Sequence, residues 1–154
     1  MQTVLLVAQF HEVFNHLIAD RPTIPDQDTV DFRTNFIIEE MKELQKAVDD
    51  KDIVGIADAL GDIQYVLDGL FLNVGLHNHK EAIIAAIHKS NMTKVCGDMD
   101  EVIQTQATIK AEHGWDTYHE QVDKYYIVKR SSDGKVMKSI FYRKPDFSFL
   151  TQGK

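Results

Sequence analysis

Cysteine is almost absent from this chain of 154 residues, and Cys96 has no second cysteine with which to form an internal disulfide. Without a sequence cue for activation, this thiol is more typical of an inert residue than of a nucleophile. No cluster of cysteine and histidine indicates a zinc site. The sequence therefore excludes a disulfide scaffold and gives no support to zinc chemistry.

Long apolar runs and an excess of positive charge are also missing. The chain has no stretch of about 18 uninterrupted apolar residues, and its start lacks the charged and apolar regions of a signal peptide. With 17 Lys and Arg against 24 Asp and Glu, the net charge of −7 opposes attraction to nucleic acid or anionic membranes. We expect a cytoplasmic protein that binds neither, and a polyphosphate ligand would need divalent cations as mediators.

The hydrophobic content of 44% is enough to fill the core of one domain, which we expect to span residues 1–154. Apolar residues at helical spacing predict about five helices, with Asp28 and Asp52 as caps of the second and third. The expected ranges are 3–19, 29–50, 53–76, 80–94 and 99–112. Extended patterns on both sides of an Asp-Gly pair predict a hairpin at about 125–143. The expected fold class is mainly α, a helical bundle with a small C-terminal β-hairpin.

Four acidic side chains fall within apolar stripes of the second and third predicted helices. At 100° per residue, Glu40 and Glu43 share a row with apolar residues on both sides. Asp58 and Asp62 lie in the second apolar stripe of the third helix, which is apolar on two sides and is therefore expected to be sandwiched. We expect all four carboxylates to face inward.

Burying unpaired carboxylates is costly, so such groups need partners, protons or a metal ion. Magnesium prefers oxygen ligands and keeps waters and substrate phosphates in its shell, so this pattern favours a Mg²⁺ site, with Mn²⁺ as a substitute. Glu39 falls on the arc that meets water and is given a lesser role. The expected metal ligands are Glu40, Glu43, Asp58 and Asp62. The alternative is that these acids lie on solvated surface or form ion pairs with lysines, namely Lys42, Lys46, Lys89 or Lys94.

Five blocks of the sequence carry a family resemblance: QFHEVF at 9–14, FIIEEMKEL at 36–44, ADALGDIQYVLDG at 57–69, HKSNMTKV at 88–95 and SDGKVMKSIFYRKPD at 132–146. Together they resemble the all-α nucleoside triphosphate pyrophosphohydrolases, in the MazG-like and phosphoribosyl-ATP pyrophosphohydrolase-like branch. The resemblance implies a helical bundle assembled as a homodimer or homotetramer. It also implies magnesium-dependent cleavage between the α and β phosphates of a nucleotide.

The resemblance assigns roles to individual positions. Glu40 and Glu43 match the family's first acidic pair and Asp62 matches the end of the second. The family usually spaces its second pair by three residues, whereas here Asp58 stands four residues before Asp62, on the same helix face, and can substitute or act through water. Asn91 and Lys94 match residues that hold phosphate or nucleotide. Polarity at the end of a helix is an equally good explanation for that last pair.

The function that follows from these expectations is a hydrolase of phosphoric anhydrides that releases a nucleoside monophosphate and pyrophosphate. Its expected substrate is dUTP or another pyrimidine or non-standard triphosphate, as in sanitising of the nucleotide pool. A carboxylate among Glu39, Glu40 and Glu43 would position or deprotonate water, and Lys94 would stabilise the leaving pyrophosphate. A phosphoribosyl-ATP pyrophosphohydrolase and a non-catalytic oligomeric adaptor stay open as alternatives. A di-iron carboxylate bundle is disfavoured, because no Glu and His lie three residues apart on a helix.

Overall fold

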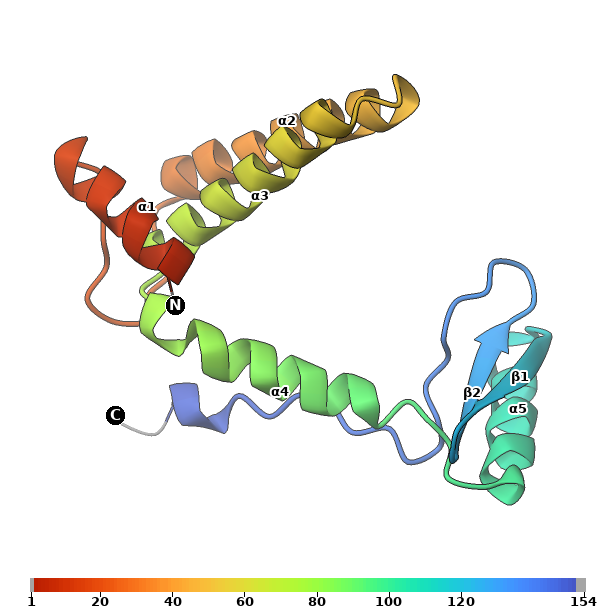
Figure 1. Cartoon of the computed structure of the whole chain (residues 1–154). Helices are drawn as coiled ribbons and strands as arrows, with labels where there is room; N and C mark the ends of the chain where they lie inside the picture. The colour runs from red at the N-terminus through yellow and green to blue at the C-terminus, as the bar shows by residue number, and fades with distance from the viewer. Residues whose placement is uncertain (1, 152–154) are drawn as a thin grey trace. The chain divides into compact units, whose positions relative to one another are not determined.

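The computed structural model describes residues 2–151, which fold into two compact units. The N-terminal unit ends at Glu81 and the C-terminal unit begins at Ala82. The described residues form five α-helices, two short 3-10 helices and one two-stranded antiparallel sheet (Figure 1). The expected mainly α fold with a C-terminal hairpin is confirmed. That both units act as one domain stays a prediction.

The N-terminal unit consists of α1 (Gln2–Val13), α2 (Gln27–Asp49), α3 (Ile53–Asn73) and the 3-10 helix η1 (His77–His79). Helices α2 and α3 lie side by side over most of their length, and α1 packs against α3 (Figure 1). The buried core of this unit joins Val4 and Val7 of α1 to Leu72 of α3. Helix α3 therefore contacts both of the other helices.

The ends of these helices are set by capping side chains and by local backbone conformation. The side chain of Asp26 caps α2 in place of the predicted Asp28, whereas Asp52 caps α3 as predicted. Helix α1 ends at Val13, well before the predicted residue 19. It ends there because Asn15 adopts a positive φ of 54°, which no right-handed helix accommodates.

The C-terminal unit contains most of α4 (Lys80–Met92), followed by α5 (Met99–His113), β1 (Thr117–Val122), β2 (Tyr125–Arg130) and the 3-10 helix η2 (Ser148–Leu150). Helix α5 packs against both strands, and the core between them is formed by Cys96, Val102, Ile109 and Val128. Burial raises the pKa of the Cys96 thiol, so this residue is a core side chain and not an activated nucleophile.

The hairpin lies earlier in the chain than the predicted 125–143. Strand β2 coincides with one predicted strand, but its partner is β1, paired from Thr117 opposite Arg130 to Val122 opposite Tyr125. Five of the six residues of β1 are exposed, so this strand has no alternating apolar pattern that would reveal it in the sequence.

The predicted Asp-Gly turn does reverse the chain, with Gly134 at a φ of 71°. The following segment runs beside β2 for a short distance, where the Met137 N–H donates to the Val128 carbonyl at 2.8 Å. The pairing then stops, because the Ser139 hydroxyl donates to the Thr93 carbonyl at 3.0 Å and holds the chain near the end of α4. The predicted second strand is therefore replaced by an irregular segment.

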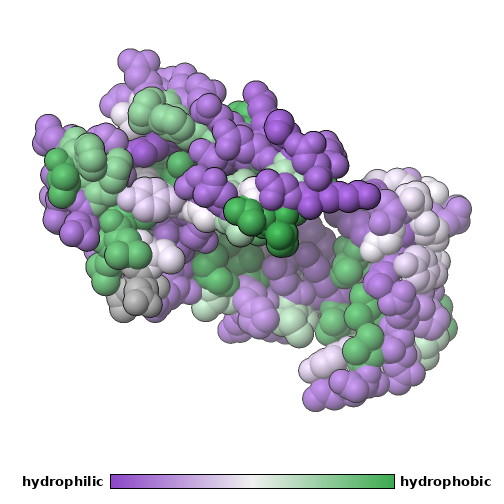
Figure 2. All heavy atoms as spheres, turned by 45° about the horizontal axis from the view of Figure 1, so that its top comes forward, coloured by the Kyte–Doolittle hydropathy of each residue, from purple (hydrophilic) through white to green (hydrophobic). Residues whose placement is uncertain are grey.

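Apolar side chains reach the surface in many places, as the green atoms among purple ones show in Figure 2. On α3, Ile53, Val54 and Leu60 are 74%, 75% and 53% exposed. The prediction that α3 is sandwiched on two sides is therefore wrong for a single chain, which covers only part of this helix. None of the helices within residues 2–151 is both long and apolar enough to cross a membrane.

Candidate functional site

The predicted acidic residues lie on two helices that pack against each other. Glu39, Glu40 and Glu43 belong to α2, whereas Asp58 and Asp62 belong to α3. Only Glu40 is partly buried and the other four are exposed. The prediction that these acids face inward is therefore wrong for all but Glu40, because a layer of two helices leaves its outer side open to water.

The electrostatic environment of Glu40 shows that the acids of both helices lie near one another. Burial raises the pKa of the Glu40 carboxyl, and the negative charges of Asp62, Glu43, Glu39 and Asp58 raise it further. Like charges disfavour ionisation of a carboxyl only when they are close to it. The five carboxylates thus form one acidic cluster around Glu40.

No lysine forms an ion pair with this acidic cluster within residues 2–151, although Lys46 is near enough to the cluster that Glu43, after Asp50, helps to raise the pKa of Lys46. Lys46 pairs instead with Asp50, with 2.9 Å between Nζ and Oδ2, one turn further along α2. None of the five acids forms an ion pair or a side-chain hydrogen bond among the described residues. The described residues therefore do not form the ion pairs of the alternative interpretation, but four of the five acids do lie on the solvated surface that this interpretation also allowed.

The chemistry of the acidic cluster fits a hard divalent cation. Its donor atoms are all carboxylate oxygens, which magnesium prefers. Across the described part of the chain, no three Asp, Glu, His or Cys side chains already converge closely enough to hold a metal ion. Like charges repel, so these side chains stay apart unless a cation draws them together. That one metal ion is bound by the carboxylates of Glu40, Glu43, Asp58 and Asp62 stays a prediction.

A cavity of about 200 Å³ begins one helical turn from the acidic cluster. Phe36 precedes Glu40 by four residues on α2, and Tyr65 follows Asp62 by three residues on α3, so both helices pass from acidic to aromatic within one turn. Phe10 of α1 closes the cavity with its ring edge-to-face on Tyr65, at 5.8 Å between centroids. We call it the aromatic cavity.

A buried polar network forms one wall of the aromatic cavity. Arg33 donates to Nε2 of His11 at 3.1 Å and to Oδ1 of Asn73 at 2.6 Å. The other ring nitrogen of His11, Nδ1, donates to the Leu17 carbonyl at 2.9 Å. Burial lowers the pKa of His11, so the ring is held neutral. With every polar atom of the imidazole paired, this wall is fixed in place.

The predicted phosphate-binding residues lie in the C-terminal unit. Asn91 is exposed near the end of α4, and its carbonyl accepts the Lys94 N–H at 3.1 Å. Lys94 lines a second cavity, which belongs entirely to that unit and includes Lys135 and Lys138. That Asn91 and Lys94 contact a nucleotide held by the acidic cluster stays a prediction.

One buried ion pair of the N-terminal unit was not predicted from the sequence. Asp68 of α3 is fully buried and pairs with Lys80, the first residue of α4. Its second oxygen, Oδ2, has no hydrogen-bond partner among the described residues. The available signal was a single acid within the apolar run from Tyr65 to Leu72, where an unpaired charge would be costly.

Comparison with known proteins places the acidic cluster inside a recognised family region. A sequence model described as phosphoribosyl-ATP pyrophosphohydrolase matches residues 7–91, more than half of the chain. The match includes all five acids and ends at Asn91, before Lys94 and the whole of α5 and the hairpin. The resemblance drawn from the sequence blocks is thereby confirmed.

Among curated proteins, the chain is similar to the uncharacterized protein L479 of Acanthamoeba polyphaga mimivirus. The two are 30% identical over 77 residues, which is 47% of this chain and 31% of the viral protein. The matched region is thus less than a third of that relative's own length.

Proposed function

The chain belongs to the phosphoribosyl-ATP pyrophosphohydrolase family, which supports a pyrophosphohydrolase-type activity, and on this premise we propose that it is a magnesium-dependent nucleoside triphosphate pyrophosphohydrolase. It cleaves between the α and β phosphates and releases a nucleoside monophosphate and pyrophosphate. The observation that carries this proposal is the acidic cluster around Glu40, which forms no ion pair with a described lysine and lies within the family match.

In this proposal, Glu40, Glu43, Asp58 and Asp62 hold the metal ion. When bound, magnesium supplies charge neutralisation for the phosphates and orients them for attack. The glutamates of α2 position the attacking water or accept its proton, with Glu39 assisting from the exposed side. Metal binding and activation of water both depend on the negative charge of these carboxylates. Loss of one charge should therefore lower turnover more than it lowers the stability of the fold.

The family resemblance assigns phosphate binding to Asn91 and Lys94, and we propose these two roles from the resemblance alone. The Asn91 amide donates a hydrogen bond to a phosphate oxygen, and Lys94 stabilises the leaving pyrophosphate with its charge. Both residues are accessible, since Asn91 is exposed and Lys94 is partly exposed.

The aromatic cavity is the proposed site for the base of the substrate. Phe36 and Tyr65 each lie about one helical turn from an acid of the cluster, so a base among these rings keeps its phosphates near the carboxylates. Aromatic rings bind planar bases by stacking and edge contacts. The volume of about 200 Å³ is below the usual range of about 300–1,000 Å³ for ligand pockets, which favours a single-ring base over a purine. We therefore propose dUTP or another pyrimidine triphosphate as substrate, with nucleotide-pool sanitising as the role.

The proposed enzyme is a homodimer or homotetramer. Three apolar residues of α3 are more than half exposed in a single chain, namely Ile53, Val54 and Leu60. Exposed apolar faces of this extent are typical of surfaces that a further subunit covers. This assembly is tested by the molar mass of the protein in solution.

The central experiment incubates the purified protein with a panel of triphosphates, Mg²⁺ or Mn²⁺, and measures pyrophosphate separately from orthophosphate. Pyrophosphate release from pyrimidine triphosphates is the expected result. Glu43→Gln and Asp62→Asn should each lower turnover by about a hundredfold or more, since they remove charge at the reacting phosphates. The matched control is Asp49→Asn, an exposed acid on α2 that bonds only to Gln45, and it should retain turnover. Full turnover in both site variants would overturn the assignment.

The hydrolysis panel and a magnesium titration distinguish two alternative functions from the proposed one. The description of the matching family names phosphoribosyl-ATP, so this compound belongs in the panel, and its exclusive hydrolysis would replace the triphosphate substrate. A non-catalytic adaptor has no reason to bind magnesium through the acidic cluster. Calorimetric titration with Mg²⁺ that shows no heat in the wild type, together with no hydrolysis, would therefore favour the adaptor.

A further inference from the structure

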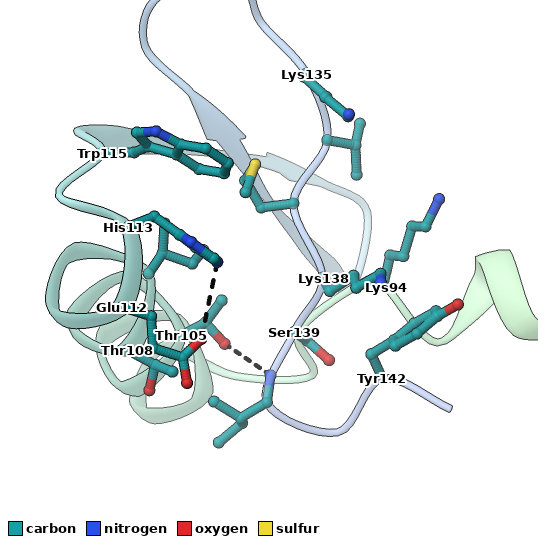
Figure 3. A pocket seen from close by; sticks show the side chains of 14 residues that line it. Lys94, Thr105, Thr108, Glu112, His113, Trp115, Lys135, Lys138, Ser139 and Tyr142 are labelled. Atoms are coloured by element: carbon teal, nitrogen blue, oxygen red, sulfur yellow. Dashed lines mark hydrogen bonds and ion pairs between the residues drawn. The ribbon is translucent and has the colours of Figure 1, made fainter. Parts of the chain in front are cut away.

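A cavity of about 430 Å³ opens within the C-terminal unit, between α5 and the segment that follows the hairpin (Figure 3). All of its lining residues lie between Lys94 and Tyr142, outside the region of the family match. Its volume is within the range of pockets that hold small organic ligands. The family match therefore assigns no role to this second cavity, which we call the lysine cavity.

The charge of the lysine cavity is opposite to that of the chain as a whole. Residues 1–81 contain six Lys and Arg against 15 Asp and Glu, whereas residues 82–154 contain 11 against nine. Three lysines line the cavity, Lys94, Lys135 and Lys138, and none of them forms an ion pair among the described residues. The single acid of the lining, Glu112, lies 3.8 Å from the His113 ring. Lys138 also lies over the Tyr142 ring, at 4.6 Å from its centroid. The Arg130 hydrogen bond and, to a smaller extent, the charge of Lys135 lower the pKa of Asp133. The three lysines still leave this cavity with an excess of positive charge, which favours an anionic ligand.

The opposite wall of the lysine cavity is aromatic. Trp115 stacks on His113, with 4.4 Å between ring centroids, and the Arg130 guanidinium lies 4.6 Å from the indole centroid. Figure 3 shows these two rings facing the cavity across from Lys94 and Tyr142. Aromatic and lysine groups on opposite sides suit a ligand with a planar ring at one end and a negative charge at the other.

The walls of the lysine cavity are held by hydrogen bonds between distant parts of the unit. Thr105 of α5 accepts the Ile140 N–H at 3.2 Å, and the nearly buried Ser139 donates to the Thr93 carbonyl at 3.0 Å. These two bonds lie next to Lys138 and Lys94 in the chain. They fix the backbone from which both lysines project, so the charges are positioned before a ligand arrives.

We propose that the lysine cavity binds a nucleoside monophosphate. The phosphate is held by Lys94, Lys135 and Lys138, and the base contacts the edges of the stacked His113 and Trp115 rings. Glu112 accepts a hydrogen bond from an amino group of the base, which favours adenine or cytosine over uracil. No carboxylate pair lines this cavity, so binding requires no divalent cation. The inference does not depend on the acidic cluster, which lies in the other unit; Lys94 is shared with the proposed hydrolase site, so Lys135 and Lys138 test the cavity.

The chain contains one tryptophan, Trp115, so its intrinsic fluorescence reports directly on the lysine cavity. The experiment titrates the full protein in EDTA with AMP, CMP, UMP and ribose 5-phosphate. A saturable fluorescence change with AMP and CMP is expected, with weaker binding of UMP and of ribose 5-phosphate. No change with any nucleotide, or equal affinity for ribose 5-phosphate, would overturn the proposal, because the aromatic wall would then have no role.

Substitution of the cavity lysines tests whether the fluorescence change comes from binding in the lysine cavity. Lys138→Ala and Lys135→Ala should each weaken AMP binding by about tenfold, which is the usual effect of losing one charged contact to phosphate. The matched control is Lys124→Ala, an exposed lysine at the turn between β1 and β2, and its affinity should equal that of the wild type. Equal loss in all three variants would contradict a site in this cavity.

One further variant separates this inference from the proposed hydrolase activity. Asp62→Asn should lose turnover and keep the full fluorescence change, because Asp62 lies in the N-terminal unit. A protein that hydrolyses triphosphates but shows no fluorescence change would refute only the lysine cavity. A protein that shows the change but no hydrolysis would refute only the proposed activity.

Discussion

Arg33 donates a hydrogen bond to Nε2 of His11 at 3.1 Å, deep in the N-terminal unit, where both residues are less than 10% exposed. Nδ1 of the same ring faces the Leu17 carbonyl, which can only accept, so the ring proton is on Nδ1 and Nε2 is the acceptor. This arrangement exists only for neutral histidine. Protonation of Nε2 would remove the acceptor and place a second positive charge beside the guanidinium.

The fold should therefore lose stability as the pH falls below the ordinary histidine pKa of about 6.5. Burial lowers the pKa of His11 in the folded state, so between the two pKa values the unfolded chain binds more protons than the folded one. This contribution to stability is complete above the unfolded pKa and is lost as the pH falls through the folded pKa. Thermal unfolding measured in steps from neutral to acidic pH follows this loss.

His11→Gln isolates the effect, because glutamine can donate to Leu17 and accept from Arg33 without titrating. The melting temperature of this variant should fall less steeply with decreasing pH than that of the wild type. His119→Gln, at an exposed position of β1, is the control and should keep the wild-type slope. An identical slope in the His11 variant would show that the neutral ring does not contribute to the pH dependence.

The buried pair of Asp68 and Lys80 should contribute far more to stability than the exposed pair of Lys46 and Asp50. Lys80→Met removes the ion-pair partner that the described residues give to the fully buried Asp68 carboxylate, which costs about 3–5 kcal/mol. Lys46→Met breaks a pair whose side chains are 81% and 57% exposed, so its cost should be much smaller than that of Lys80→Met. Urea unfolding of both variants gives the two free energies.

The double variant Lys80→Met with Asp68→Leu tests the reason for this difference. It should recover much of the lost free energy of unfolding, because neither buried charge remains. If the double variant is as unstable as Lys80→Met, the loss comes from packing of the lysine stem and not from the uncompensated carboxylate.

Helices were predictable here because their signals are local and repeat over many residues. Apolar residues recur with a period of about 3.6 through the whole of α3. The capping residues lie directly beside the helices that they bound, with Asp52 before α3 and Gly114 after α5. That the two acids of α2 share one face, and that the two acids of α3 share one face, was predictable for the same reason, since residues three or four apart lie on the same side of a helix. Burial of those acids was not, because it depends on what covers the helices from outside.

The C-terminal unit was less predictable because its organising contacts are not local. Strand β1 is mostly exposed and leaves no pattern, so the wrong partner was assigned to β2. The lysine cavity joins Lys94, Trp115 and Lys138, which are separated by about twenty residues each along the chain and share no motif. The core between α5 and the strands and the hydrogen bonds of the Thr105 and Ser139 hydroxyls bring these side chains to one place.

Thr93 should hold the segment after the hairpin in place. Its hydroxyl accepts the Arg143 N–H at 2.9 Å and donates to the Ser90 carbonyl at 2.7 Å. Thr93→Val keeps the volume and removes both bonds, so the Arg143 amide should exchange with deuterium about tenfold faster, in line with one lost hydrogen bond. Thr108→Val, at an exposed position on α5, is the matched control. Unchanged exchange at Arg143 would mean that other contacts hold this segment.

Removal of one charge from the acidic cluster should have opposite effects with and without magnesium. Without metal, Glu43→Gln relieves repulsion from its carboxylate neighbours, which include Glu40, and should raise the free energy of unfolding by about 0.2–0.5 kcal/mol. With Mg²⁺ at about one hundred times its dissociation constant, the wild type should gain about 2.7 kcal/mol. The variant has one ligand fewer and should gain much less.

Thermal unfolding of the wild type and Glu43→Gln in EDTA and in Mg²⁺ measures this reversal. Asp49→Asn removes one acidic charge from the same helix outside the cluster and should keep the full magnesium gain, which controls for general effects of charge and ionic strength. The order of stability is the decisive quantity, because it must invert between the two conditions if the carboxylates share a cation. An equal gain from magnesium in all three proteins would mean that the ion acts by screening alone, and the acidic cluster would then have no metal to hold.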